Sequence, residues 1–469
     1  MKRIKCFMKG LVPVLLCALL PLLSACSDND DISLYDVAVQ LSYPENSEPY
    51  AGAPVELRNT TGAGLYQATT DASGKAIFHV PAGVYEVTTA DVREAEGFRY
   101  ICNGTLAQLV VQDGVAASAT VQVNVAKMNT EHPIIIKEIY NGGVWNTATN
   151  KNFIQDKCII LYNNSNEDVT MDNLAITIGP GYNAEASSTQ KLYADGKLHY
   201  ADEDWIPGYA GIWYFQGAVT IPAFSQLVVN VHGAINNTQV DGLANSVNYA
   251  NADYYCMYDP DYEGPGTSAN NKFFNNTSYY PTPADVIPTS HYLKTVKLAQ
   301  GNAWPMSVTS PAVMIYQTKG TTPKAHAENA DNAYTHLGYS GPTWGGTKIP
   351  REWILDGVEV WKAGSESASV KRLTDDIDVG HVSLTNAQGH VLYRNVDKAS
   401  TEALPENAGK LVYIPDFCDC PIPAAFPTVA PVPAPTLPLR GSLPEKLASH
   451  ASYPIPASGR TAKLPYPRS

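Results

Sequence analysis

Short apolar runs separated by turn residues constrain this chain more than any other feature of its sequence. Within residues 133–181, the runs at 134–139 and 158–162 are too short for helices, rich in β-branched side chains and bounded by clusters of Asn, Gly and Asp. Residues 162–168 have the composition of a turn, because Asn and Asp tolerate left-handed backbone and bond their own chain. The pattern predicts strands, and therefore an all-β fold.

Two groups of such runs predict two β-sandwiches. In the first, over residues 32–127, alternating segments recur at the spacing expected of a sandwich and are separated by turns at 71–74 and 81–83. The second, over residues 133–416, contains every Trp of the chain. The strands predicted for the first sandwich are residues 37–41, 55–57, 76–80, 84–88, 106–111 and 119–125.

The second predicted sandwich carries long loop insertions. Residues 182–301 are rich in Asn, Gly, Tyr and Pro, and a structureless loop of that length is unusual, so we expect short strands there that decorate one face. The runs on either side of Asp356 and Gly357 fit a hairpin turn or, equally, one edge strand with a bulge. Further strands are predicted at residues 169–178, 211–215, 227–231, 312–316, 353–355, 358–361, 379–384 and 391–395.

The first 25 residues predict a secretory leader. Its apolar centre at residues 11–23 is too short, and too promptly followed by acidic residues, for a membrane-spanning helix. Leu-Ser-Ala before Cys26 is the pattern of a bacterial lipobox, in which the thiol takes the lipid; an ordinary cleaved leader is the alternative. Acyl chains such as palmitate would anchor the protein durably, since each buried CH₂ contributes about 0.8 kcal/mol. Residues 26–31 form an acidic tether that resembles the surface-export signal of Bacteroidetes lipoproteins, with a solvated spacer as the alternative.

Composition narrows the classes of function. The net charge of −13 becomes −17 once the leader and its four basic residues are removed, and no cluster of Lys and Arg suits phosphates, so nucleic-acid binding is not expected.

Five cysteines follow Cys26, an odd number without metal-type spacing, so we expect one disulfide at most and a buried, inert Cys158. Residues 417–469 are rich in Pro and Ala and lack periodicity, which predicts a disordered tail or one that arises from a shifted reading frame.

Two passages resemble known modules. Residues 70–87, TDASGKAIFHVPAGVYEV, are similar to the carboxypeptidase regulatory-like, prealbumin-type fold, which implies a spacer that lifts the second sandwich off the membrane. Residues 135–140 (IIKEIY), 159–169 (IILYNNSNEDV) and 174–178 resemble the lamin-tail family. That resemblance implies an immunoglobulin-like β-sandwich, so the expected architecture is two immunoglobulin-like sandwiches.

A further resemblance is to a family of Bacteroidetes surface lipoproteins. It rests on IPTSHYLK at residues 287–294, NAWPM at 302–306 and IPREWILDGVE at 349–359. The likeness spans residues 133–396, and it implies architecture and cellular address rather than a reaction.

Candidate sites for chemistry are few. The ten His include no His-Glu-x-x-His pair, and the chain has no Gly-x-Ser-x-Gly elbow, so we do not expect an enzyme. Asp259, Asp261 and Glu263 alternate, which in an extended chain points three carboxylates to one side and makes them the candidate Ca²⁺ ligands. A solvated acidic loop is the expectation, with the Ca²⁺ site as the alternative. His291 is expected to be a structural His bonded to a backbone carbonyl.

The same region is dense in aromatic residues. Tyr254, Tyr255, Tyr258 and Tyr262 are the candidate ligand-binding residues, because flat amphipathic rings stack on sugars or seal an interface at low entropy cost. The alternative is that these rings pack the long loop onto the sheet.

Together these features predict a non-catalytic binding protein, lipid-anchored in the outer membrane and exposed at the cell surface, that serves a TonB-dependent transporter. No cofactor is expected, and Ca²⁺ at residues 259–263 is the one candidate. Two alternatives stay open. One is an adhesin or glycan-binding surface protein that uses the Tyr-rich loops, and the other is a metal-dependent hydrolase built on residues 259–263.

Overall fold

Strands make up nearly all of the regular structure, so the predicted all-β fold class is confirmed. The structure is a computed structural model that describes residues 33–421, apart from 45–46, 96, 186–191, 263–273, 275, 300, 338–344, 387–388 and 405–409. Within these residues the α-helices are short, α3 (Pro323–Glu328) and α4 (Lys398–Ala403). In this described part of the chain, no helix has the length and apolar character needed to cross a membrane.

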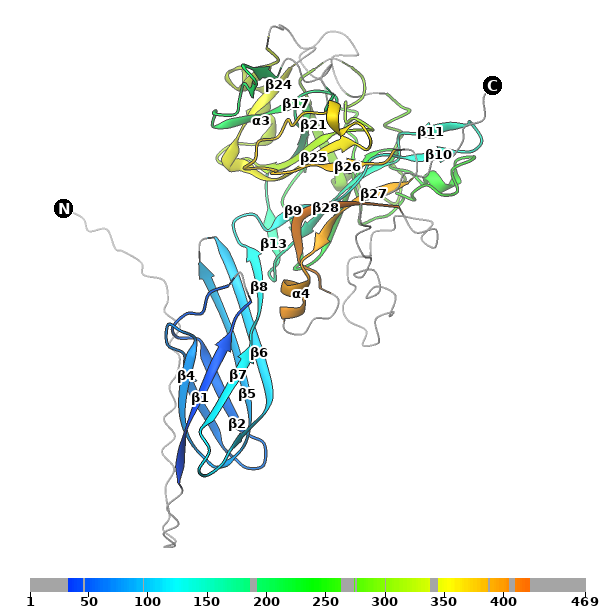
Figure 1. The fold of residues 1–469 in the computed structure, drawn as a ribbon. Coiled ribbons are helices and arrows are strands. Elements are labelled where there is room, and N and C mark those ends of the chain that lie inside the picture. Colours follow the sequence, from blue (N-terminus) through cyan, green and yellow to red (C-terminus); the bar gives the residue numbers. More distant parts are fainter. Residues whose placement is uncertain are drawn as a thin grey trace, which may run out of the picture.

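Residues 34–129, here called the first module, form two packed sheets (Figure 1, lower part). Their strands are β1 (Leu34–Ser42), β2 (Pro54–Asn59), β3 (Leu65–Thr69), β4 (Lys75–Pro81), β5 (Gly83–Ala95), β6 (Phe98–Val111), β7 (Ala117–Gln122) and β8 (Asn124–Asn129). The sheet orders are β4-β1-β7 and β3-β2-β5-β6-β8. Inward residues of both sheets, such as Val37, Leu57 and Tyr85, form one apolar core. Buried and exposed residues alternate along β1 and β4, as in sheets with one face in solvent.

Two features of the first module differ from the prediction. The predicted strand at residues 119–125 is divided into β7 and β8, because the chain passes from one sheet to the other at Val123: β7 pairs with β1, and β8 pairs with β6. The sequence also does not predict β3. This edge strand has no buried residue, so it lacks the apolar face that a pattern search detects.

Residues 134–421, here called the second module, form a continuous 14-stranded sheet in two facing halves. The strands are β9 (Ile134–Tyr140), β12 (Lys157–Asn163), β14 (Leu174–Ile178), β17 (Trp205–Tyr214), β19 (Gln226–His232), β20 (Tyr255–Met257), β21 (Tyr292–Lys297), β22 (Ala312–Gln317), β23 (Ala333–Thr335), β24 (Gly345–Pro350), β25 (Ile354–Lys362), β26 (Val382–Leu384), β27 (His390–Val396) and β28 (Tyr413–Pro421). One half has the order β26-β25-β22-β14-β17-β21, and the other β20-β19-β12-β9-β27-β28. β20 pairs in parallel with β19 and β21 and so joins the halves.

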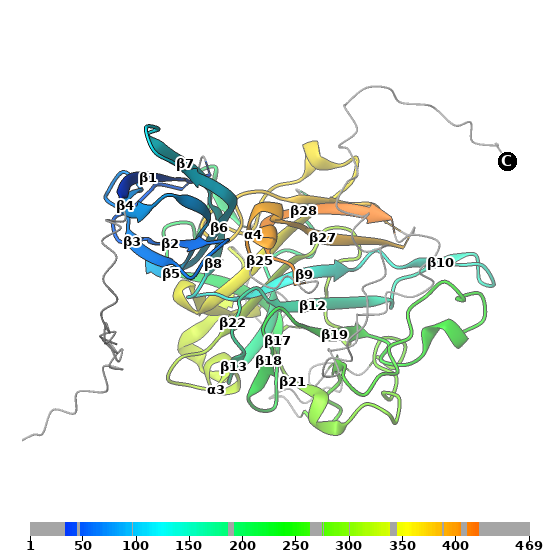
Figure 2. The same ribbon diagram turned by 90° about the horizontal axis from the view of Figure 1, so that it is seen from below.

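Three short two-stranded sheets complete the second module. They are β10 (Val144–Asn146) with β11 (Lys151–Phe153), β13 (Val169–Met171) with β18 (Val219–Ile221), and β15 (Tyr193–Ala194) with β16 (Lys197–Leu198). The first of these hairpins projects from the side of the module in Figure 1. Figure 2 shows β9, β12 and β19 running side by side, with this hairpin to their right.

The core of the second module lies between the two halves, where Ile159 of β12 and Ile176 of β14 join one apolar cluster. The outer faces are covered as well, so every residue of β12 and β14 is buried. Burial on both faces explains why these runs are continuously apolar rather than alternating. The prediction that residues 182–301 decorate one face is wrong. Tyr200 and Tyr249, both from that segment, lie in clusters on opposite outer faces.

The two apolar runs around Asp356 belong to one strand, β25, so the bulge alternative is confirmed. The register of β25 against β22 shifts beside Asp356, where one extra residue is accommodated. β25 is not an edge strand, however, because it pairs with both β22 and β26. The predicted strand at residues 169–178 is likewise divided into β13 and β14. Asn173 lies between them with a φ of 57°, a left-handed conformation that Asn tolerates.

The second module continues beyond its predicted end at residue 416. β28 extends to Pro421 and pairs with β27, and the Phe417 ring packs 4.8 Å from the Arg394 guanidinium. The predicted start of the Pro-rich tail at residue 417 is therefore wrong. Strand pairing and this aromatic contact hold residues whose sequence, rich in Cys, Asp and Pro, gives little strand signal. Residues 422–469 lie outside the described part of the chain.

Candidate functional site

Part of the predicted site lies outside the described residues. The leader at residues 1–25, the acidic tether at 26–31 and Cys26 within it are not described, and neither is Glu263. Lipidation at Cys26 therefore stays a prediction.

Within the acidic run at residues 259–263, Asp259 is only 6% exposed and is bonded to other residues of the protein. Lys294 Nζ donates to Asp259 Oδ1 over 2.9 Å, and the Thr295 backbone N–H donates to Oδ2 over 3.0 Å. Asp261, by contrast, is exposed. Among the described residues, no group of three His, Cys, Asp or Glu side chains is placed to hold a metal ion. The Ca²⁺ site, which includes Glu263, stays a prediction.

The four candidate tyrosines fall into two kinds. Tyr254 and Tyr262 are 6% and 7% exposed and lie in the apolar clusters on opposite outer faces, so these two rings pack the chain. Burial raises the pKa of each phenol to about 12. Tyr255 and Tyr258 are half-buried. They are the members of the predicted set whose rings a ligand can reach.

Each half-buried tyrosine is paired with a ring near the start of β21. Tyr255 stacks on His291 with 4.1 Å between ring centroids, and Tyr258 meets Tyr292 edge-to-face at 5.5 Å. His291 Nδ1 lies 3.2 Å from the Tyr254 carbonyl oxygen, so its prediction as a structural His bonded to a backbone carbonyl is confirmed. The aromatic segment thus fastens β20 to β21, where the two halves of the sheet join.

A buried polar cluster lies where β9 ends and β12 begins. Asn141 follows β9, and Lys157 opens the antiparallel neighbour β12, so both lie at the same end of the sheet. The Asn141 side-chain amide donates to the Ser307 carbonyl over 2.6 Å, and Lys157 Nζ donates to the Met306 carbonyl over 2.5 Å. Residues 302–307 therefore cap the core, held by side chains that sequence patterns do not single out.

Lys157 is buried without a carboxylate as its acceptor. It pairs across the sheet with His232, beside an irregularity in the register, and both side chains are 2% exposed. Burial lowers the pKa of Lys157 to about 7. Burial, with Lys157 nearby, also lowers the pKa of His232 well below its ordinary value. Burial therefore shifts both groups toward their neutral forms relative to solution.

Asp156, the residue before Lys157, bonds a different set of partners. Its Oδ2 accepts hydrogen bonds from Ser246 Oγ over 2.7 Å and from Tyr140 Oη over 3.1 Å, and its Oδ1 accepts one from Asn237 Nδ2 over 3.4 Å. Burial raises the pKa of this carboxyl to about 6. Asp156 thus anchors the loop that contains Ser246 to the start of β12.

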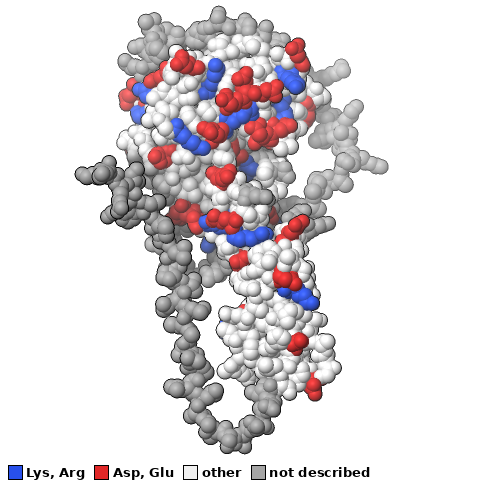
Figure 3. All heavy atoms as spheres, turned by 90° about the vertical axis from the view of Figure 1, so that its left-hand side faces the viewer, with Lys and Arg blue, Asp and Glu red and all other residues white. Residues whose placement is uncertain are grey.

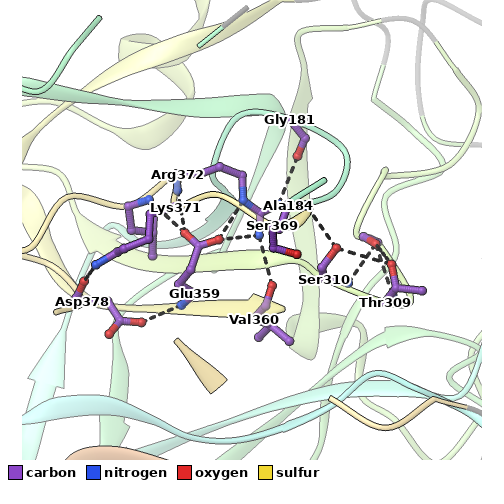
Figure 4. Close-up of polar contacts among 12 residues, drawn as sticks. Gly181, Ala184, Thr309, Ser310, Glu359, Val360, Ser369, Lys371, Arg372 and Asp378 are labelled. Carbon is purple, nitrogen blue, oxygen red and sulfur yellow. Dashed lines mark hydrogen bonds and ion pairs between the residues drawn. The ribbon is translucent and has the colours of Figure 1, made fainter. Parts of the chain in front are cut away.

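A fully buried ion pair joins β25 to the segment around Arg372 (Figure 4). Glu359 and Arg372 are both 0% exposed. Glu359 Oε1 accepts from Arg372 Nε over 2.9 Å and from Nη2 over 2.7 Å, while Oε2 accepts from the backbone N–H groups of Arg372 and Leu373. All hydrogen-bonding positions of the carboxylate are used, so the pair fastens the segment around Arg372 to β25.

These groups have structural roles because solvent and substrate cannot reach them. A neutral buried amine such as Lys157 is chemically reactive in principle, but a nucleophile needs an open position beside it. One shallow hollow lies on the first module and has a volume of about 560 Å³. Its one ionisable lining residue, Glu56, already bonds Arg58 and Gln67.

Fold and contacts together define an all-β protein of two modules in which the buried side chains of Asp156, Lys157 and Glu359 are held in structural bonds. Comparison with known proteins agrees with this class. Residues 225–413 match the model of DUF4876, a protein family of unknown function. This part of the chain is therefore similar to the DUF4876 family. A search of curated proteins finds no match.

Solved structures give the fold but no activity. A DUF4876 family protein from Bacteroides thetaiotaomicron superimposes with a TM-score of 0.54 at 18% identity, over 82% of this chain and 95% of that one. A candidate adhesin of Bacteroides ovatus gives a TM-score of 0.18 at 9% identity, over 64% of this chain and 86% of that one. A DUF3823 family protein from Parabacteroides merdae gives 0.15 at 10% identity, over 41% and 98%. Only the first likeness bears on the fold.

Proposed function

We propose that this protein is a non-catalytic binding protein of the cell surface, lipid-anchored in the outer membrane through Cys26. The observation that carries the proposal is the use made of the buried ionisable groups. Asp259, Asp156 and Glu359 are buried and have their carboxylate oxygens bonded within the protein, which gives them structural roles. A scaffold of this kind offers surfaces and loops for recognition.

The finer part of the proposal concerns the two modules. The first serves as a spacer of the carboxypeptidase regulatory-like type, and the second as a lamin-tail-like sandwich with covering insertions. Figure 3 supports this division of roles, because on the face it shows the Lys, Arg, Asp and Glu side chains gather on the second module and are sparse on the first. On that face acidic and basic groups are intermixed, as expected of a protein that does not bind nucleic acid.

The proposed partner is a TonB-dependent outer-membrane transporter. The test is affinity purification of the tagged protein from detergent-solubilised outer membrane, followed by mass spectrometry. The control is a tagged Cys26→Ser variant, which lacks the thiol that would take the lipid. Recovery of a transporter with the wild-type chain alone supports the proposal, and its absence from repeated purifications contradicts it.

One observation favours glycan binding as a second candidate function. Trp145 lies on the projecting hairpin of β10 and β11 and is 49% exposed, although Trp is ordinarily well buried. An exposed flat ring is suited to stacking on a sugar. A glycan array with wild type and Trp145→Ala distinguishes the candidates, because an adhesin would bind immobilised sugars without a transporter.

The third candidate, a metal-dependent hydrolase at residues 259–263, needs Asp259 to exchange its present partners for a cation. Calcium titration with a melting assay and a hydrolase substrate screen tests it. Turnover that depends on Asp261 would establish the hydrolase. Calcium-dependent melting without turnover would leave a structural ion.

A further inference from the structure

We infer that the connection between β27 and β28 is a clamp that fixes the second module on the first, so that the two modules move as one body. The clamp comprises α4 (Lys398–Ala403) together with Leu404 and Val412. It leaves the second module and lies against β8 and β6 of the first module, as Figure 1 shows for the orange helix. The inference goes beyond the proposed function and does not depend on it.

Apolar contact is the first part of the clamp. Ile101 of β6 and Ala126 of β8 are register partners in the five-stranded sheet, and both lie on its outer face, away from the core of the first module. They form a buried cluster with Ala403, Leu404 and Val412 of the second module. This part of the sheet face, which would otherwise be exposed to solvent, is therefore covered. Separating the two modules would expose these apolar side chains to water.

Hydrogen bonds fix the orientation of the clamp. Asn103 Nδ2, from the same sheet face, donates to the Ala403 carbonyl at the end of α4. The start of α4 is set by Asp397, whose Oδ1 accepts from the Ser400 backbone N–H over 2.9 Å. The helix is thus held at both ends, by its own cap and by the first module.

A second contact lies apart from α4. Arg99, on the β5–β6 hairpin of the first module, donates through Nη1 to Glu167 Oε1 over 2.6 Å and to Asn166 Oδ1 over 3.1 Å, both in the turn after β12. The same guanidinium bonds Glu94 on its own hairpin, and its side chain is only 19% exposed. Arg99 therefore joins the hairpin to the second module.

The short connection between β8 and β9 is also held. Thr130 donates through both its backbone N–H and its hydroxyl to the Gly97 carbonyl, each over 2.9 Å. The Asn129 side chain accepts from the backbone N–H groups of Glu131 and His132. A hinge needs a few residues that are free to change φ and ψ, and these are bonded. Three separate contacts thus oppose rotation about the linker.

The test is the distribution of distances between spin labels on the two modules. Labels are placed through Lys75→Cys and Lys362→Cys, both exposed positions, in the chain without its leader and with Cys26 and the cysteines of β28 replaced by Ser. We expect one narrow distance distribution for the otherwise wild-type chain. Leu404→Asp, which puts a carboxylate into the apolar contact, is expected at least to double the width of the distribution.

Val110→Asp is the matched control, because Val110 also lies on β6 but is 49% exposed, away from the clamp. It should leave the distribution narrow. Circular dichroism verifies that each variant is folded, and the milder pair Arg99→Ala with Asn103→Ala replaces Leu404→Asp if that variant unfolds. A broad distribution in the wild-type chain overturns the inference, and so does a narrow distribution that none of these variants broadens.

Discussion

Lys157→Met is the substitution whose effect can be worked out most fully. Burial moves the pKa of the amine from 10.5 to about 7, so the folded protein binds this proton less tightly than the unfolded chain does. Each pKa unit corresponds to about 1.36 kcal/mol. Below pH 7, the buried amine therefore lowers the free energy of unfolding by about 5 kcal/mol relative to its value in strongly alkaline solution. A Met side chain has similar length and no charge, and it loses about 1 kcal/mol with the hydrogen bond to Met306.

The sign of the pH dependence follows from linkage. A Lys whose folded pKa is depressed contributes stability above its unfolded pKa, and that contribution is lost as pH falls through the interval from 10.5 to about 7. The wild-type protein should therefore gain stability between pH 6 and pH 9.5 relative to Lys157→Met. At pH 6 the variant should be more stable than the wild type by a few kcal/mol.

Urea denaturation of both proteins at pH 6 and pH 9.5 measures this difference. Groups whose pKa does not depend on Lys157 cancel in the comparison, whereas that of His232 does depend on it. Lys362→Met, at an exposed position, is the control and should show no pH-dependent difference. If Lys157→Met is destabilised equally at both pH values, the amine is not held neutral by burial and the reasoning is refuted.

Three further predictions follow from the buried groups. Glu359→Gln leaves Arg372 buried without a carboxylate and should cost about 3–5 kcal/mol in urea denaturation, whereas Glu359→Leu with Arg372→Met should recover most of it; a neutral single variant would contradict the account. Because burial raises the pKa of Asp156 to about 6, its contribution to stability is present below the unfolded pKa and lost as pH rises through 6. As pH falls from 8 to 3.5, the free energy of unfolding of the wild type should therefore rise by about 3 kcal/mol relative to that of Asp156→Asn. A pH-independent difference would contradict the raised pKa of Asp156. Since Asp259 is bonded to Lys294 and Thr295, millimolar Ca²⁺ should leave the melting temperature unchanged; an increase that Asp261→Asn abolishes would establish an ion site.

The fold class follows from the sequence because local patterns carry it. Runs such as 134–139 and 158–162 are short, β-branched and bounded by turn residues, and they are strands in the structure. The sequence does not reveal how the two halves of the sheet in the second module are joined. β20 has only three residues and owes its strand conformation to pairing with β19 and β21, which are far from each other along the chain. Long-range pairing of this kind leaves no local pattern.

The chemistry of the second module was harder to predict for the same reason. Asp259 and the tyrosines stand out in the sequence, yet the structure uses Asp259, Tyr254 and Tyr262 in packing and hydrogen bonds. Lys157 and Glu359 lie in no motif of known chemistry. Their one sequence signal is a charged residue beside or within an apolar strand, which indicates a buried polar group but not its partner.

Surface display is the central claim, and labelling of intact cells tests it most directly. An antibody or an impermeant biotin reagent is applied to intact cells and to cells whose outer membrane has been permeabilised, with the wild-type chain and with Cys26→Ser. The account predicts that intact cells label as strongly as permeabilised ones for the wild type, and that labelling of the cell surface is lost with Cys26→Ser. Labelling of the wild-type protein only after permeabilisation would contradict it.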